Sequence, residues 1–285
     1  MRTNGDSRSA EANAEAIAKA AGSSFYVGMR LLPKPEREAM FAIYAFCRAV
    51  DDIADDGTET RPARRAALEA WRQDIEALYE GRDAARAAFL ADYVSRYRLR
   101  KQDFLTVIDG MEMDVAEDIR APDLKTLDLY CDRVASAVGR LSVKIFGMDE
   151  EPGLQLAHHL GRALQLTNIL RDLDEDAGVG RLYLPREYLE EADIVSRDPL
   201  IVIGNRAVDA ACRSVARLAH DHYREAERVM DARPKGKLRA PRLMGAVYSR
   251  ILSKMEKAGW APPRHRVRLG RGQLMWVVLR HGLAA

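Results

Sequence analysis

Residues 44–56 read YAFCRAVDDIADD, and their spacing predicts a helix with one functional face. On a helix that turns by about 100° per residue, four of its polar side chains fall within roughly 60° of one another. These are Tyr44, Arg48, Asp51 and Asp55. The stripe continues the line of the apolar residues before it, so it is expected to face the interior. Because two carboxylates one turn apart are costly to bury without a cation between them, the stripe predicts a metal site.

Residues 165–176 read QLTNILRDLDED and repeat this arrangement. Their oxygen-bearing side chains recur at intervals of three and four: Gln165, Asn168, Asp172 and Asp176. Oxygen ligands without His or Cys suit a hard cation such as Mg²⁺, which completes its coordination shell with water and substrate phosphates. Either stripe alone is more typical of a solvated acidic helix end. Two such stripes on otherwise apolar helices favour a clamp for a diphosphate.

The rest of the chain predicts an all-α fold. It has 285 residues, of which 47% are hydrophobic, so it can bury a large core. Long segments are rich in Ala, Leu, Arg and Glu, whereas β-branched runs and Asn-Gly turns are scarce. We expect a disordered leader over residues 1–9 and a single helical domain over residues 10–285. The expected helices cover residues 10–22, 36–57, 61–79, 84–97, 101–116, 124–146, 152–176, 205–230 and 238–258.

The helical pattern is broken at two places that could form loops over a substrate. They lie at residues 178–180, which read GVG, and at residues 261–263, which read APP. Loops that close over charged substrates often have this composition, although a glycine after a helix is more often only a cap. We interpret both segments as candidate mobile flaps.

The charge of the chain is unevenly distributed. The net charge is only +2, but the segment from Asp231 onward is strongly basic. Such a segment suits phosphates, a membrane surface or nucleic acid, and a plain solvated helical face is an equal alternative for each residue. Because no nucleic-acid-binding module or interleaved aromatic pattern accompanies it, no nucleic acid partner is expected.

The cysteines and the hydropathy pattern indicate the cellular compartment of the protein. Cys47, Cys131 and Cys212 are odd in number and lack CxxC spacing, which is typical of a reducing cytoplasm. No stretch approaches the roughly 18 uninterrupted apolar residues that span a bilayer. We therefore expect a cytoplasmic protein with at most weak, salt-sensitive contact with the inner membrane.

Three of these stretches carry a resemblance to a known family. Residues 22–26, 44–55 and 165–185 resemble the squalene/phytoene synthase family of head-to-head prenyl synthases, and the likeness extends over nearly the whole chain after about residue 15. Residues 29–33, 109–114 and 119–122 are most similar to the bacterial branch that makes presqualene diphosphate for squalene and hopanoid biosynthesis. The resemblance implies an isoprenoid synthase fold around a central active-site cavity, three bound Mg²⁺ ions and two farnesyl diphosphate molecules.

The resemblance also implies roles for individual residues. The metal ligands would be Asp51, Asp55, Asn168, Asp172 and Asp176. The catalytic residues would be Tyr44, Arg48, Arg171 and Tyr183. The substrate would be bound by Ser24, Phe25, Tyr44, Arg48, Tyr130, Val134, Ala135, Gly139, Gln165, Asn168, Arg171, Tyr183 and Tyr248. Taken singly, each tyrosine is more typical of core packing, but Tyr44 and Tyr183 gain weight because each neighbours an acidic motif.

The implied activity is that of a prenyltransferase of isoprenoid biosynthesis. With Mg²⁺, it would join two farnesyl diphosphates, release pyrophosphate and give presqualene diphosphate, without NADPH. The product would pass to squalene-forming enzymes. The alternatives are a squalene, dehydrosqualene or phytoene synthase of the same family, and a non-catalytic assembly factor with the same fold. The choice between C15 and C20 substrates depends on the depth of the cavity.

Overall fold

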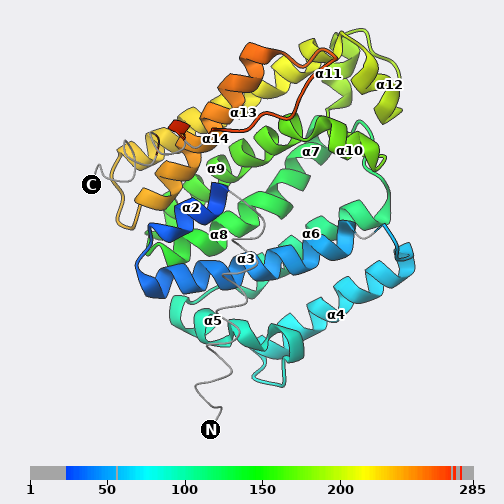
Figure 1. Cartoon of the computed structure of the whole chain (residues 1–285). Helices are drawn as coiled ribbons and strands as arrows, with labels where there is room; N and C mark the ends of the chain where they lie inside the picture. Colours follow the sequence, from blue (N-terminus) through cyan, green and yellow to red (C-terminus); the bar gives the residue numbers. More distant parts are fainter. Residues whose placement is uncertain (1–23, 56, 271, 274–276, 278–285) are drawn as a thin grey trace.

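The computed structural model describes residues 24–55, 57–270, 272–273 and 277, and within these ranges it contains helices and no β-strand (Figure 1). The prediction of an all-α fold is confirmed. The leader expected over residues 1–9 and the helix expected over residues 10–22 lie outside the described residues.

The described helices follow one another with short connections. In chain order they are α2 (Ser24–Arg30), α3 (Lys34–Asp55), α4 (Arg61–Tyr79), the 3₁₀ helix η1 (Ala85–Leu90), α5 (Ala91–Tyr97), α6 (Lys101–Ala116), α7 (Leu124–Cys131), the π-helix η2 (Asp132–Ser136), α8 (Ala137–Ile145), α9 (Glu150–Arg171), α10 (Leu173–Gly178), α11 (Arg186–Glu191), α12 (Pro199–Gly204), α13 (Val208–Asp231) and α14 (Arg239–Ala258). The bounds of α4 and α6 are those predicted from the sequence. Thr60 caps α4, because its hydroxyl oxygen accepts the N–H of Ala63 at 3.3 Å.

Two apolar clusters form the core. One joins α9, α13 and α14, and the other joins α3, α4, α6 and α8. Helix α9 packs against α8 on one side and against α13 and α14 on the other (Figure 1). The partly buried side chains of Val134 and Met148 contact both clusters. The space that becomes the functional site therefore lies where the two clusters meet.

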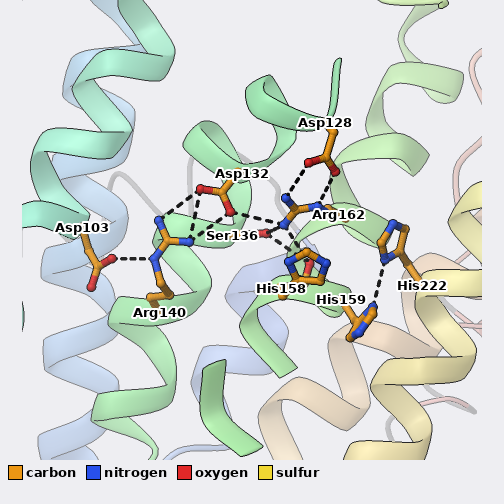
Figure 2. Close-up of polar contacts among 9 residues, drawn as sticks. All are labelled: Asp103, Asp128, Asp132, Ser136, Arg140, His158, His159, Arg162 and His222. Carbon is orange, nitrogen blue, oxygen red and sulfur yellow. Dashed lines mark hydrogen bonds and ion pairs between the residues drawn. The ribbon is translucent and has the colours of Figure 1, made fainter. Parts of the chain in front are cut away.

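The helix predicted over residues 124–146 is continuous from Leu124 to Ile145, but the five residues Asp132–Ser136 within it form the π-helix η2, which the sequence did not predict. Helix α9 approaches η2 so closely that a Cβ atom on Gly161 would lie 2.8 Å from the backbone of Ser136. Arg162 donates to the hydroxyl of Ser136 at 2.9 Å, and that hydroxyl donates to the carbonyl of His158 at 3.2 Å (Figure 2). A π-turn holds one extra residue and changes the direction of the side chains beside it.

The helix predicted over residues 152–176 is divided into α9 and α10. Asp172 lies at the junction with φ −104° and ψ 18°. The backbone bonds continue across it, because the N–H of Asp172 donates to Asn168 at 2.9 Å and the N–H of Asp176 donates to Asp172 at 2.8 Å. The predicted stripe from Gln165 to Asp176 therefore survives the break.

The segment between α10 and α13 contains two short helices that the sequence did not predict, α11 and α12. Helix α12 starts with Pro199, and the carboxylate of Asp198 accepts the N–H groups of Leu200 and Ile201 at 2.9 and 3.2 Å. Six residues are too few for a clear helical period, so only the cap signals this helix.

Both candidate flaps are fastened to neighbouring segments. The carbonyl of Gly180 accepts Arg120 Nε at 2.8 Å, and the N–H of Leu182 donates to Ile119 at 2.7 Å. After residues 261–263, Arg264 donates to the carbonyl of Ile203 at 3.0 Å. Their opening remains a prediction. Among the described residues, no helix combines the length and the apolar character needed to cross a membrane.

Candidate active site

A cavity of about 300 Å³ lies between α3, α6, η2, α8 and α9. Its walls are mostly apolar, with Ile43, Val107, Leu160 and Leu164 among them. Nine residues predicted as substrate or metal contacts line it: Tyr44, Arg48, Asp51, Tyr130, Val134, Ala135, Gly139, Gln165 and Asn168. Apolar pockets with a few convergent polar groups are the usual form of a ligand site. The structure thus brings together residues that lie more than a hundred positions apart in the sequence.

The first acidic motif lies at the C-terminal end of α3, where arginines contact its carboxylates. Arg48 reaches Asp51 at 2.7 Å and Asp52 at 2.6 Å. Arg181, from the segment after α10, reaches Asp55 at 2.6 Å. Burial raises the pKa of Asp51 to about 6, and the neighbouring charge of Asp55 adds to the shift. The carboxylates of this motif therefore repel one another unless a positive charge lies beside them.

In the second acidic motif, too, arginines contact the carboxylates and burial raises the pKa of one aspartate. Arg171 donates to Asp172 through two bonds of 2.8 and 2.7 Å, and Arg266 reaches Asp172 at 2.7 Å. Burial raises the pKa of Asp176 to about 7, and the charges of Asp172, Asp114 and Asp55 add to the shift. The charge of Asp55 in the first motif raises the pKa of Asp176 in the second, so the two motifs interact electrostatically.

Asn168 provides an independent test of whether the site fits a cation. Its side-chain oxygen is buried and has no hydrogen-bond partner among the described residues. Its amide nitrogen donates to Gln165 at 3.4 Å, so the oxygen is directed elsewhere. A buried oxygen without a partner costs about 1–3 kcal/mol. An oxygen of this kind beside repelling carboxylates fits a hard cation such as Mg²⁺.

A buried carboxylate that the sequence reasoning did not assign lies beside the motifs. Asp114 accepts the hydroxyl of Tyr183 at 2.7 Å and that of Tyr130 at 3.0 Å. The two rings stack with centroids 4.8 Å apart. Burial raises the pKa of Asp114, although the Arg181 charge opposes the shift. An Asp on the apolar face of α6, after Met111, was the sequence signal that could have revealed it.

The remaining predicted residues do not line this cavity, or their side chains lie outside the described part. Tyr248 faces Arg171, whose guanidinium carbon lies 6.0 Å from the ring centroid. Ser24 and Phe25 begin α2, but their side chains lie outside the described residues. Arg181 and Arg266 were not assigned a role from the sequence, because their partners Asp55 and Asp172 lie far from them along the chain.

Comparisons with known proteins agree with this arrangement. The sequence pattern described as squalene/phytoene synthase matches residues 18–273. The chain belongs to the squalene/phytoene synthase family. A presqualene diphosphate synthase of Zymomonas mobilis is 55% identical over 267 residues, covering 93% of this chain and 90% of the relative. The presqualene diphosphate synthase of Sinorhizobium fredii is 52% identical and covers 96% of this chain and 98% of the relative.

A solved structure of this family shares the architecture. The squalene synthase of Alicyclobacillus acidocaldarius superposes with a TM-score of 0.79 at 26% identity, covering 91% of this chain and 98% of that one. The predicted isoprenoid synthase fold, with helices around a central cavity, is confirmed.

Metal binding in a squalene/phytoene synthase of this geometry should depend on pH in a defined direction. Asp51 and Asp176 have pKa values of about 6 and 7 here, well above those of an unfolded chain. They therefore lower the stability of the metal-free protein as the pH rises from about 4 towards these values, and the loss is complete once the pH exceeds about 7. We expect Mg²⁺ to raise the melting temperature more at pH 8 than at pH 6.

Thermal melting with and without Mg²⁺ at both pH values measures this difference. At about 100 times its Kd, the metal should add about 2.7 kcal/mol at pH 8. The variant D221N serves as the control, because it makes the same chemical change in an exposed pair with Arg224 outside the motifs and should leave the difference unchanged. Equal shifts at the two pH values in the wild type would contradict the prediction.

Proposed function

We propose that this chain is a presqualene diphosphate synthase, a Mg²⁺-dependent prenyltransferase that joins two farnesyl diphosphates with release of pyrophosphate. The observation that carries the proposal is that Asp51 of the first motif and Asn168 of the second, whose side-chain oxygen has no partner among the described residues, line one apolar cavity, while the charge of Asp55 acts on Asp176. A prenyl diphosphate matches this site, because its diphosphate suits the polar residues and its isoprenoid chain suits the apolar walls. The names and the identity of the relatives from Zymomonas mobilis and Sinorhizobium fredii support the choice of product.

In this proposal the acidic side chains hold the metal and the arginines hold the diphosphates. Asp51, Asp55, Asn168, Asp172 and Asp176 are the metal ligands. When bound, Mg²⁺ would neutralise the diphosphate and make pyrophosphate a better leaving group. The ion pairs of Arg48 and Arg171 with these motifs keep both guanidinium groups beside the site. Once the carboxylates coordinate metal, both groups can turn to phosphate oxygens, for which their planar forks are suited.

The cavity walls direct the reaction that follows. The C1–O bond of one farnesyl diphosphate breaks, and the allylic cation is attacked by the C2=C3 double bond of the other. Loss of a proton, for which released pyrophosphate is the base, closes the cyclopropane ring. Tyr130 lines the cavity, where its ring would stabilise positive charge; Tyr183 stacks on it, and Asp114 fixes the orientation of both rings. The apolar lining excludes water, which would quench the cation.

The product distinguishes this proposal from the other members of the family. A squalene synthase ionises the cyclopropyl intermediate again and takes hydride from NADPH, whereas dehydrosqualene and phytoene synthases end with loss of a proton. We expect the purified protein to convert farnesyl diphosphate and Mg²⁺ into a product that yields presqualene alcohol after phosphatase treatment. Mass spectrometry should give the same yield with and without NADPH.

The same incubation tests the alternatives. Squalene formed only with NADPH would assign the chain to the squalene synthases. A hydrocarbon formed without NADPH would assign it to the dehydrosqualene or phytoene synthases, and geranylgeranyl diphosphate as a parallel substrate separates C15 from C20. No turnover with either substrate, in a protein that still binds Mg²⁺, would favour a non-catalytic assembly factor.

We propose further that the enzyme works in the cytoplasm and makes at most a weak electrostatic contact with the inner membrane. Its product then passes to squalene-forming enzymes. The basic segment after Asp231 supports a salt-sensitive contact. Cell fractionation tests it, because a protein that stays with the membrane after a high-salt wash would contradict a purely electrostatic contact.

A further inference from the structure

Three histidines gather between α9 and α13, away from the cavity. His158 and His159 are neighbours in α9, and His222 lies in α13 (Figure 2). The Nδ1 atoms of His159 and His222 are 3.0 Å apart, and one ring nitrogen from each of the three lies within 4.8 Å of the others. None of the three lines the cavity. Along α9, His158 precedes Asn168 by ten residues, which is about 15 Å of helix.

We propose that His158, His159 and His222 form a binding site for a borderline divalent cation, with Zn²⁺ as the best match, separate from the acidic Mg²⁺ site. Imidazole nitrogens are favoured ligands of Zn²⁺ but poor ligands of Mg²⁺. Two nitrogens bound to a tetrahedral zinc at about 2.0–2.1 Å lie about 3.3 Å apart. The 3.0 Å pair is already close to that spacing.

The third ligand requires only a side-chain adjustment. His158 is the exposed member of the group, and its ring contacts that of His159 at a centroid distance of 4.7 Å. An exposed side chain changes rotamer without disturbing the packing of α9 on α13. Three protein ligands leave the fourth position of the ion to water or to a small anion, as in zinc sites that exchange ligands.

The protonation of the rings is compatible with metal binding. At 3.0 Å, one Nδ1 must donate a hydrogen and the other must accept it. A cation takes the place of that shared hydrogen, and the donor ring then carries its proton on Nε2. Burial lowers the pKa of all three histidines, to about 4 for His222, so the rings are neutral near pH 7.

The positive charge that faces the histidines is largely paired with carboxylates. The charge of Arg162 lowers the pKa of all three histidines, but its guanidinium is paired with Asp128 at 2.6 Å and with Asp132 at 3.3 Å (Figure 2). Arg140 is paired with Asp132 at 3.1 Å and with Asp103 at 2.6 Å. This group holds three carboxylates against two guanidinium groups. On the α13 side, Glu225 and Arg228 pair with each other and cancel.

The test uses Co²⁺ as a visible stand-in for Zn²⁺, because Co²⁺ absorbs strongly only in tetrahedral or five-coordinate sites. Titration of the full chain is made in excess Mg²⁺, which saturates the acidic motifs. We expect one Co²⁺ per chain and its displacement by Zn²⁺. Zn²⁺ should also raise the melting temperature, because it joins α9 to α13.

Substitutions identify the ligands. H222A and H159A should each weaken Co²⁺ binding at least tenfold, whereas H220A, a histidine in the same helix whose ring contacts Glu256, should leave it unchanged. H158A, at the exposed position, is the variant that cannot disturb the core, and it should also weaken binding. Equal binding in the wild type and H158A, H159A and H222A would overturn the proposal, as would no binding by the wild type at millimolar Co²⁺.

Discussion

Replacing Asp176 by Asn should lower kcat by about a thousandfold and at the same time stabilise the metal-free protein. Asp176 lies on the stripe that continues from Asn168 and Asp172, and a thousandfold loss corresponds to about 4 kcal/mol of transition-state stabilisation. The gain in stability has a separate cause. The pKa of Asp176 is raised to about 7, so at pH 8 the folded protein holds an unfavourable charge that Asn removes.

Steady-state kinetics and chemical denaturation measure the two effects. The full shift of the pKa would correspond to roughly 4 kcal/mol, but partial exposure screens it, and we expect a gain of about 1 kcal/mol in the free energy of unfolding at pH 8. The control is D221N, which makes the same chemical change in an exposed pair with Arg224. It should leave both quantities unchanged. A D176N variant that loses activity and stability together would indicate a structural role instead.

The second large effect is expected for Arg162, the buried guanidinium that holds η2. Its side chain is 5% exposed and donates to Asp128, Asp132 and Ser136 (Figure 2). R162A removes these charge-assisted bonds and leaves a cavity in the contact between α9 and η2. We expect a loss of about 3 kcal/mol in the free energy of unfolding.

Urea denaturation of R162A measures this loss. The matched control is R228A, because Arg228 is 69% exposed and makes a pair with Glu225 within one helix, which is worth about 0.5 kcal/mol or less. Activity should also fall in R162A, since η2 carries Val134 and Ala135 into the cavity. A loss below about 1 kcal/mol would mean that the network of Arg162 is not needed to hold the π-turn.

The sequence could predict features whose cause is local. Helices α4 and α6 have the predicted bounds, because helix propensity, apolar period and caps all act over a few residues. The spacing of Asp51 and Asp55, and of Asn168, Asp172 and Asp176, predicts that each set of oxygens lies on one face of its helix. That spacing survives the break at Asp172, because the backbone bonds between residues four apart continue through it.

Only the tertiary structure decided which distant residues meet. Arg181 contacts Asp55 across more than a hundred residues, and the hydroxyls of Tyr130 and Tyr183 converge on Asp114. Gly161 lets α9 approach Ser136 in the π-turn of η2, a contact that no local period encodes. The sequence by itself determined the fold class and predicted the oxygen-bearing residues proposed as ligands, since both follow from short-range spacing. The charge partners and the shape of the cavity depend on long-range packing, so only the folded chain determined them.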